Sequence, residues 1–449
     1  MAEILEERTG RELFEEHYDV LAPAWNDAPA WLRDLRRDAM TRFSELDLPT
    51  ARLEEWRQTS VEALRGTSFA VEAPVPTPEA IEEGLRQYDI PELGGARLVF
   101  INGRFSPEHS RIEGLPVGTV IRPLSEALVE DGGAIEPFLG RLAPWQDHAF
   151  AALNTALFTD GLFLSLPTDS VIERPIHLLH LNGGGERPFA MHTRNLILVG
   201  SGAKGLLVES YGALDGSVYF TNSVTEVEMG RDSYFDHHKI QRESAEAFHF
   251  QSMGIHQHSG SKFDAHAMTE GGILGRNDIY AHIDGEHCDT ILNGLYMLTG
   301  NQMFDTHTLL DHARPHCHSR EIYKGILNGH SKAVFRGKIL VRQHAQKTDA
   351  VQSSKNLLLS HEAQVNAQPQ LEIYADDVKC THGATIGQLD PDALFYAKTR
   401  GLSEVEAKAL LTFAFANDNL YEVVDETVRE HLEGRIHHWL EQHGAPEEE

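Results

Sequence analysis

The sequence predicts a mainly β protein with helical ends, and three observations support this fold class. Between Leu162 and Ile386, short apolar runs such as IHLLHL, NLILVG and KAVFRGKILV are separated by Gly, Asp, Asn and His. No helical stretch of about 10–15 residues separates these runs, so βαβ units are not expected in the core, residues 156–388. The flanking segments instead show the apolar spacing of amphipathic helices. Such an array of short strands fits a sandwich, a large barrel or a β-solenoid, and the residues alone leave these three open.

The N-terminal region, residues 1–155, is expected to be helical with one small β-hairpin. One helical face near its start carries Leu13, Phe14, His17 and Leu21. Residues 70–93 are rich in Pro and Glu and predict a linker. The stretch ARLVFINGRFSPEHS, from Ala96, predicts a strand, a tight Asn-Gly turn and a second short strand. Helix returns over residues 122–160, where Phe150 is expected to pack on the β region that follows.

The C-terminal domain, residues 389–449, is predicted to hold three helices. The first spans residues 390–399 and the third spans residues 421–440. Ser403 begins the second helix, and Glu406 three residues later completes a capping box. The apolar stripe of this second helix comprises Ala407, Leu410, Leu411, Ala414 and Phe415.

Composition and charge predict a cytoplasmic globular protein that binds neither nucleic acid nor membrane. The 449 residues are 41% hydrophobic and 24% charged, which allows two or three domains with a large core. Sixty-eight acidic residues against 39 basic ones give a net charge of −29, which disfavours a phosphate backbone as partner. No run of about 18 apolar residues predicts a membrane span. The first residues, MAEILEERTGRELFEEH, are acidic and amphipathic, unlike a signal peptide.

The cysteine count limits the redox and metal chemistry of the chain. Cys288, Cys317 and Cys380 are too few and too scattered for a disulfide framework. They cannot hold an iron–sulfur cluster alone, because such a cluster usually takes four thiolates.

A glycine-rich stretch, Gly200 to Gly205, matches the dinucleotide-binding fingerprint. That fingerprint requires a helix next, whose N-terminus meets the pyrophosphate. Here the next residues are LLVES, which predict a strand. We therefore interpret this stretch as a β-turn.

Histidines are unusually frequent, and twelve of the 26 fall between His237 and His318. His256 and His258 on an apparent strand resemble the His-x-His of cupin metal sites, although the next carboxylate, Glu270, is distant. A cupin-like metal-binding protein is therefore one alternative. The densest set of candidate ligands comprises His312, His316, Cys317 and His318.

A thiol and an imidazole two residues apart, Cys380 and His382, lie where the β region ends and the helices begin. If this junction is extended, both side chains share one face. One sulfur and one imidazole make half of a site for a thiophilic metal, so a partner would supply the rest. The chain has no nucleophile elbow, no His-Glu-x-x-His and no Walker lysine, so no enzymatic activity is expected.

The stretch CTHGATIGQLDPDALFYAKTRGLSEVEAKALLTFAFA resembles the C-terminal signature of the SufB/SufD family, the scaffold pair of the Suf iron–sulfur cluster assembly machine. The resemblance extends to PTARLEEW, LVFINGRFSPEHS, FAALNTALFTDG and ERPIHLLHL, and so to nearly the whole chain. Within the family, the Cys-x-His-Gly form and the low cysteine count are similar to the SufD branch. The SufB branch tends to carry His-Glu at the positions of His382 and Gly383.

This resemblance implies a right-handed parallel β-helix core and a non-catalytic scaffold subunit. It implies pairing with SufB through the ends of the two β-helices, where Cys380 and His382 help to hold a transient Fe–S cluster. It also implies docking of the SufC ATPase on residues 391–419. The expected partner-binding residues are Asp390, Leu394, Phe395, Tyr396, Arg400, Leu402, Leu411 and Phe415.

Three questions stay open under this resemblance. No cofactor is expected to bind the chain stably alone, and binding of a reduced flavin in the complex is left open. The chain alone could form a homodimer. The alternative to a ligand-donating scaffold is a purely structural partner with no metal role.

Overall fold

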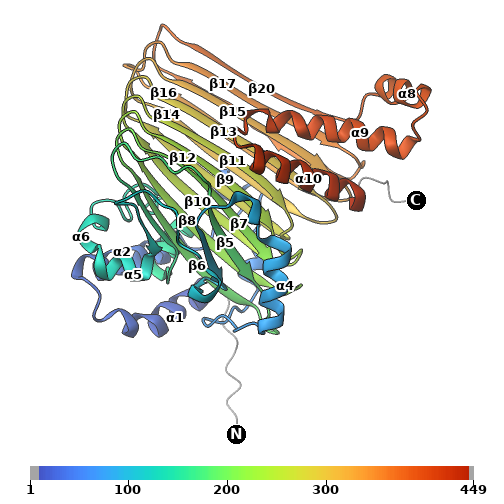
Figure 1. Ribbon diagram of the computed structural model, residues 1–449. Coiled ribbons are helices and arrows are strands. Elements are labelled where there is room, and N and C mark those ends of the chain that lie inside the picture. The colour runs from blue at the N-terminus through green and yellow to red at the C-terminus, as the bar shows by residue number, and fades with distance from the viewer. Residues whose placement is uncertain (1–9, 444–449) are drawn as a thin grey trace.

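The computed structural model describes residues 10–443 and shows a β-solenoid with helices at both ends (Figure 1). This confirms the predicted β-helix core and helical termini. The first nine residues, which entered the localisation prediction, lie outside the described range. No helix within residues 10–443 is long and apolar enough to cross a membrane.

Two ten-stranded sheets form the solenoid, and the chain alternates between them. Sheet A contains β3 (Val120–Pro123), β4 (Leu162–Leu166), β6 (Phe189–Val199), β8 (Tyr219–Met229), β10 (Phe248–Gln257), β12 (Leu274–Ile283), β14 (Met303–His312), β16 (Lys332–Val341), β18 (Gln364–Ala367) and β19 (Gln370–Ile373). Sheet B contains β2 (Arg104–Phe105), β1 (Arg97–Ile101), β5 (Ile176–Asn182), β7 (Lys204–Ala213), β9 (Tyr234–Arg242), β11 (Lys262–Glu270), β13 (Asp289–Leu298), β15 (His318–Leu327), β17 (Asp349–Leu358) and β20 (Lys379–Gly387). All strand pairs are parallel except β1 with β2 and β3 with β4.

The helices flank this core. They are α1 (Arg11–Leu21), α2 (Ala30–Leu46), α3 (Glu62–Arg65), α4 (Pro78–Tyr88), α5 (Leu124–Glu130), α6 (Gly132–Ile135), α7 (Ala149–Leu157), α8 (Pro391–Thr399), α9 (Glu404–Asn417) and α10 (Glu426–His443). Single 3₁₀ turns are η1 (Ala22–Trp25), η2 (Glu54–Trp56), η3 (Pro91–Leu93), η4 (Pro107–His109) and η5 (Asp418–Glu422).

Apolar side chains from the inner faces of both sheets fill the solenoid. Because side chains alternate along a strand, every second residue points inward and stacks on its equivalent in the next coil. The resulting core includes Leu207, Phe235 and Phe263 from sheet B and Val227, Ile255 and Ile283 from sheet A. This stacking makes one continuous core along the solenoid.

Successive coils turn at stacked left-handed corners. The corner residues on one edge include Asp232, Gly260, His287, His316 and Lys347, all with positive φ. The N–H of Asp232 donates to the C=O of Ser259 at 3.0 Å, and the N–H of His316 donates to the C=O of Gln346 at 2.9 Å. A left-handed conformation costs a non-Gly residue about 1 kcal/mol or more, which these inter-coil hydrogen bonds help to offset. The glycine-rich stretch at residues 200–205 is one such turn, between β6 and β7, so its prediction as a turn is confirmed.

The N-terminal region closes the first coils. Strands β1 and β2 form the predicted hairpin, with Asn102 and Gly103 both at positive φ in the turn. This prediction is confirmed, and the structure adds that β1 and β3 extend the two sheets of the solenoid.

The predicted linker at residues 70–93 is wrong, because it contains helix α4. Thr77 caps this helix by accepting the N–H of Ala80, and Pro78 occupies its first turn. Ile81 and Tyr88 are buried at helical spacing, so the segment packs on the protein despite its Pro and Glu content.

Two buried arginines fasten the N-terminal helices to the outer face of sheet A. Arg194 pairs with Glu226 at 2.5 Å, and Glu226 also accepts the N–H of Gly140 at 2.8 Å. Arg276 lies 3.9 Å from the centre of the Trp56 ring. As predicted, Phe150 packs on the β region, with its ring stacked 4.3 Å from that of Phe250. The helices are therefore part of one packed body with the solenoid.

The C-terminal helices cover the outer face of sheet B (Figure 1). Lys324 Nζ donates to the C=O of Phe415 at 2.8 Å, and Arg435 pairs with Glu270 at 2.8 Å. The capping box of Ser403 and Glu406 is confirmed. The predicted stripe of α9 is wrong in part, because Leu410 and Ala414 are exposed. The N-terminal end of α9 and helix α8 project beyond the solenoid instead of packing on it.

Candidate functional site

One end of the solenoid presents an open strand edge. Strand β20 is the last strand of sheet B and pairs with β17 on one side; along its other side the described chain places no strand. Nearly all of its residues are exposed. The opposite end finishes instead in the short antiparallel strands β2 and β3. A long parallel edge with unpaired N–H and C=O groups is a template for a further strand.

The two candidate ligands lie on this open strand and on the same face of it. Cys380 is in register with Ala350, and His382 is in register with Gln352. Ala350 and Gln352 are buried inside the solenoid, so both ligand side chains lie on the inward side at its open end. Cys380 is half-buried against the core, whereas His382 is exposed. The alternation expected from the Cys-x-His spacing is therefore present.

Partial burial raises the pKa of the Cys380 thiol, and the charge of nearby Asp349 raises it further. The sulfur therefore carries its proton at neutral pH in the isolated chain. A metal that binds here displaces that proton, since thiolate is the ligand form.

A buried carboxyl group lies two coils beneath His382, in the same inward column. Gln352 pairs in register with both His382 and Glu321, and its Nε2 donates to Glu321 at 2.6 Å. Thr308 donates to the other oxygen of Glu321. Burial without a cationic partner nearby raises the pKa of Glu321 to about 7, although these two hydrogen bonds oppose the shift. The side chains of His382, Gln352 and Glu321 thus form a polar column that runs from the open end into the solenoid.

The other two cysteines are buried in stacked turns rather than at the open edge. Cys317 Sγ lies 3.1 Å and Cys288 Sγ 3.4 Å from the C=O of Gly285. A hydrogen bond from Cys317 lowers the pKa of Cys288. Neither thiol is exposed to a partner on this surface.

The structure separates the dense ligand set expected between residues 312 and 318. His312 is buried with its Nε2 2.9 Å from Ser319 Oγ. His316 lies at an exposed corner, where its ring stacks on that of His287 at 5.0 Å. With Cys317 buried and His318 exposed, these four side chains do not form one site.

The cupin alternative is wrong, because the fold is a solenoid. Its two histidines nevertheless share a carboxylate from the preceding coil. Glu228 lies 3.0 Å from His256 Nδ1 and 2.9 Å from His258 Nε2. Glu270, the carboxylate considered from the sequence, lies on the other sheet, where it pairs with Arg435 of α10. Strand register, which the sequence does not show, selects Glu228.

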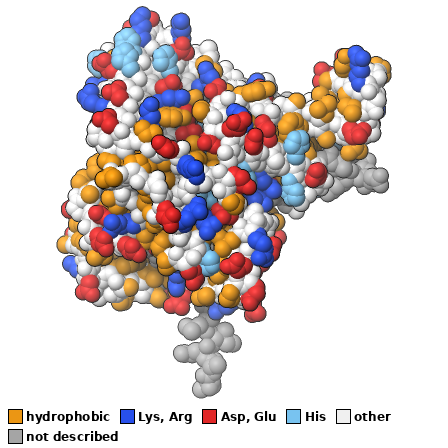
Figure 2. Space-filling view, in the orientation of Figure 1, with side chains coloured by type: hydrophobic (Ala, Val, Ile, Leu, Met, Phe, Trp, Pro, Cys, Tyr) orange, Lys and Arg blue, Asp and Glu red, His pale blue; other side chains and the backbone are white. Residues whose placement is uncertain are grey.

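The helices expected to bind a partner present an apolar surface away from the solenoid. Phe395 is 70% exposed and Tyr396 is 60% exposed on α8, which Figure 2 shows as a lobe beside the body. Arg400 donates to the Tyr396 hydroxyl at 2.7 Å, and Asp390 caps α8. The other predicted partner-binding residues, Leu394, Leu402, Leu411 and Phe415, are half-buried. Sequence reasoning missed further exposed apolar residues at Val405, Leu410, Tyr421 and Val424.

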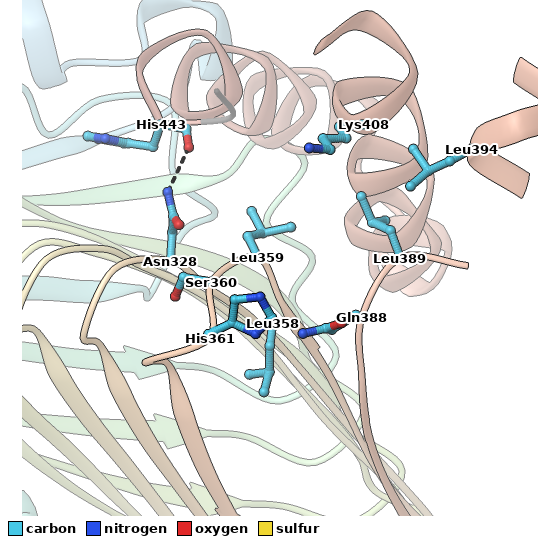
Figure 3. Close-up of a pocket in the computed structure, with 10 residues that line it drawn as sticks. All are labelled: Asn328, Leu358, Leu359, Ser360, His361, Gln388, Leu389, Leu394, Lys408 and His443. Carbon is cyan, nitrogen blue, oxygen red and sulfur yellow. Dashed lines mark hydrogen bonds between the residues drawn. The ribbon is translucent and has the colours of Figure 1, made fainter. Parts of the chain in front are cut away.

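A hollow of about 200 Å³ lies between the last coils and these helices (Figure 3). Leu359 and His361 line it from the solenoid, Leu389 from the link to α8, and Leu394 and Lys408 from the helices. The segment joining β20 to α8 therefore does not pack tightly on the sheet beside it.

Comparisons with known proteins agree with this geometry. Residues 180–415 match the SUF system FeS cluster assembly SufBD core domain, and residues 6–178 match the SufBD protein N-terminal region. The chain is 34% identical to an iron–sulfur cluster assembly SufBD family protein of Synechocystis, over 89% of this chain and 88% of that protein. It is 30% identical to the iron–sulfur cluster assembly protein SufD of Escherichia coli, over 87% and 88%. It is 28% identical to the chloroplastic protein ABCI7 of Arabidopsis thaliana, over 90% and 85%.

Fold and comparisons together define a β-solenoid protein of iron–sulfur cluster assembly. The chain belongs to the SufBD family.

The raised pKa of Glu321 predicts a pH-dependent stability. Between about pH 4.5 and about pH 7 the unfolded chain loses the Glu321 proton while the folded chain keeps it, so the free energy of unfolding falls as pH rises through this window. The loss amounts to about 3 kcal/mol at most. Glu321→Gln, which mimics the protonated form, should remove this loss. Urea unfolding at about pH 5 and about pH 8 measures the effect.

Glu362→Gln, at an exposed loop carboxylate, provides the control and should leave the pH dependence unchanged. Equal pH dependence in Glu321→Gln and in the unsubstituted protein would contradict the prediction.

Proposed function

We propose that this chain is a non-catalytic scaffold subunit of the Suf iron–sulfur cluster assembly complex. In this proposal it pairs with SufB through the open edge of β20 and docks the SufC ATPase through α8 and α9. Cys380 and His382 supply ligands to a nascent cluster at the SufB contact. The observation that carries the proposal is that both ligand-type side chains lie on a long strand edge that the described chain leaves open.

The backbone of β20 supports pairing with a second chain. The N–H of Lys379 donates to the C=O of Thr348 at 2.9 Å. In a parallel ladder such donors alternate, so the N–H and C=O groups of Cys380, His382 and Ala384 face the open edge. A partner strand that bonds to these groups lies beside both ligand side chains.

The chemistry of the pair supports a shared rather than a self-contained site. Thiolate and neutral imidazole are both iron ligands, but two donors leave at least two positions for other ligands. The iron and sulfide of the nascent cluster are cargo in this proposal, and SufB supplies the remaining ligands.

The projecting helices support docking of an ATPase. Phe395 and Tyr396 are large apolar side chains on a surface that residues 10–443 leave uncovered. Exposed clusters of this kind mark interaction sites. The far end of α9 is fastened to sheet B through the bond between Lys324 and Phe415, so force on α8 reaches the solenoid.

Edge pairing predicts that Ala384→Pro weakens binding of SufB. Proline removes an outward-facing N–H without removing a bond to β17. The lost bond and the bulk of the ring should weaken the complex by about tenfold to a hundredfold. Ala384→Ser keeps the N–H and should bind normally. Titration of purified SufB by calorimetry measures both, and equal affinity of the two variants would contradict edge pairing.

Ligand donation predicts that His382→Ala abolishes cluster maturation in cells while SufB and SufC still co-purify. Cys380→Ala is expected to reduce capture of thiophilic metal by the complex. Activity of an iron–sulfur reporter enzyme and the iron content of the complex are the measurements. Normal maturation in His382→Ala with an intact complex would favour the purely structural role.

ATPase docking predicts that Phe395→Asp lowers the affinity for SufC by at least about tenfold, because a buried aromatic contact becomes a buried charge. Val129→Asp, at an 85% exposed valine on α5, is the matched control and should bind SufC normally. Pull-down and calorimetry with purified SufC measure the effect. Unchanged affinity in Phe395→Asp would remove α8 from the interface.

A further inference from the structure

A second group of ligand-type side chains lies on the outer face of sheet B, beneath the C-terminal helices. Asp236 and His238 are two residues apart on β9, so they share a face. His266 on β11 is in register with His238. His238 is 1% exposed, and the other two are also buried. The three side chains therefore meet in a place that solvent does not reach.

The three donor atoms are spaced as ligands of one small ion. His238 Nε2 lies 3.0 Å from Asp236 Oδ1, and His266 Nε2 lies 3.8 Å from the same oxygen. The two imidazole rings stack with centres 4.8 Å apart and planes 10° apart. Ligands at about 2.0–2.1 Å from a tetrahedral ion lie about 3.3 Å from one another. The observed distances bracket that value.

These atoms are also unsatisfied. Within the described chain, Asp236 Oδ1, His238 Nε2 and His266 Nε2 are buried and make no correctly directed hydrogen bond, in spite of their short separations. Buried polar atoms without partners cost about 1–3 kcal/mol each. The three donor atoms all lie within 4.8 Å of one another, so one ion can contact all of them.

Asn293 on β13 continues the same column and can orient His266. Its amide lies 3.4 Å from His266 Nδ1, and its Oδ1 has no partner within residues 10–443. With the amide turned over, Asn293 Oδ1 accepts the Nδ1–H of His266. This fixes the tautomer that leaves Nε2 free as a ligand, as the outer shell of metal sites commonly does.

A neighbouring carboxylate matches the charge of a dication. Asp264 is in register with Asp236 and is fully buried, with Oδ1 unpartnered in the described structure. Its Oδ2 accepts from the Tyr234 hydroxyl at 3.1 Å and lies 3.1 Å from Lys262 Nζ. Two buried carboxylates side by side repel each other, and a divalent cation between the histidines and Asp236 relieves that repulsion.

The space available fits one small occupant. A cavity of about 10 Å³ adjoins His238 and His266, which is room for about one water-sized occupant. Its roof is formed by Leu420 and Val423 and by Leu432 of α10. Apolar walls exclude solvent from the site and tie it to the docked position of the C-terminal segment.

We propose that Asp236, His238 and His266 form a resident site for a divalent transition metal of the zinc class, held by two imidazoles and one carboxylate. This site is separate from Cys380 and His382 and does not depend on their proposed role. A chain that carries it is not metal-free, in contrast to the expectation from the sequence.

Metal analysis and cobalt substitution test the proposal on the full chain. The chain purified with zinc present should hold one zinc per molecule by plasma mass spectrometry. After removal of zinc with a chelator during mild unfolding and refolding, one equivalent of Co²⁺ should give the visible d–d bands of a tetrahedral ion. The melting temperature should rise on metal addition, because the ion binds the folded state.

Asp236→Asn keeps the size of the side chain, and His266→Asn replaces the imidazole by a smaller amide. Both variants should lose the zinc and the cobalt bands while circular dichroism stays unchanged. The double variant His256→Ala/His258→Ala removes the half-buried histidine pair beside Glu228, and Cys380→Ala removes the half-buried thiol on β20. Both variants should retain one metal. Zinc below about one-tenth per chain in the unsubstituted protein would overturn the proposal and assign the cavity to water. Full metal content in a folded Asp236→Asn variant would overturn it equally.

Discussion

The structure depends on the in-register parallel ladder that joins each coil to the next. Within the stack, every strand satisfies the backbone groups of its neighbours, so the chain needs no interstrand helices to complete its sheets. Within residues 10–443, the last strand of the ladder has no further strand to bond to the backbone N–H and C=O groups on its outer edge. At the first coils, short antiparallel strands and packed helices close the stack, but at β20 nothing in the described chain does so. The place where Cys380 and His382 lie is therefore a consequence of how the fold ends.

The same ladder explains how polar side chains far apart in sequence come together. Register places each residue beside its equivalent in the adjacent coil, so chemistry is organised in columns across strands. One column runs inward from His382 through Gln352 to Glu321. Another, on the outer face, runs from His238 through His266 to Asn293. Buried polar side chains without hydrogen-bond partners destabilise the folded state. A column of such side chains therefore indicates a role other than holding the coils together.

The sequence predicts the class of fold, but it does not predict which side chains stack in columns across the coils. Strand-like runs, the Asn-Gly hairpin and the capping box at Ser403 depend on local chemistry, and all three are confirmed. The linker prediction was wrong because it relied on the Pro and Glu content of the segment and not on the helical spacing of Ile81 and Tyr88. The histidine predictions failed for a different reason. Which residues stack depends on coil length, and this varies: Lys262 pairs with Asp289, whereas His318 pairs with Asp349.

The same distinction, between local sequence spacing and register across coils, separates the site residues that the sequence predicts from those that it does not. Cys380 and His382 could be found because two residues on one strand share a face whatever the register. Glu228 beside His256, and Asp236 beside His266, could not be found, because each pair bridges two coils. The sequence also does not predict that Leu410 is exposed. Apolar residues at helical spacing occur both in helices that pack within their own domain and in helices that bind a partner.

The connection from β20 to the helices links the two proposed interfaces. Gly387 ends β20 and Pro391 begins α8, so only a short segment separates the open edge from the projecting lobe. That segment borders a hollow of about 200 Å³ rather than a packed surface. The far end of α9 cannot follow freely, because the contact between Lys324 and Phe415 holds it on sheet B. In the proposed complex, a pull on α8 is transmitted through this segment to the strand that carries Cys380 and His382.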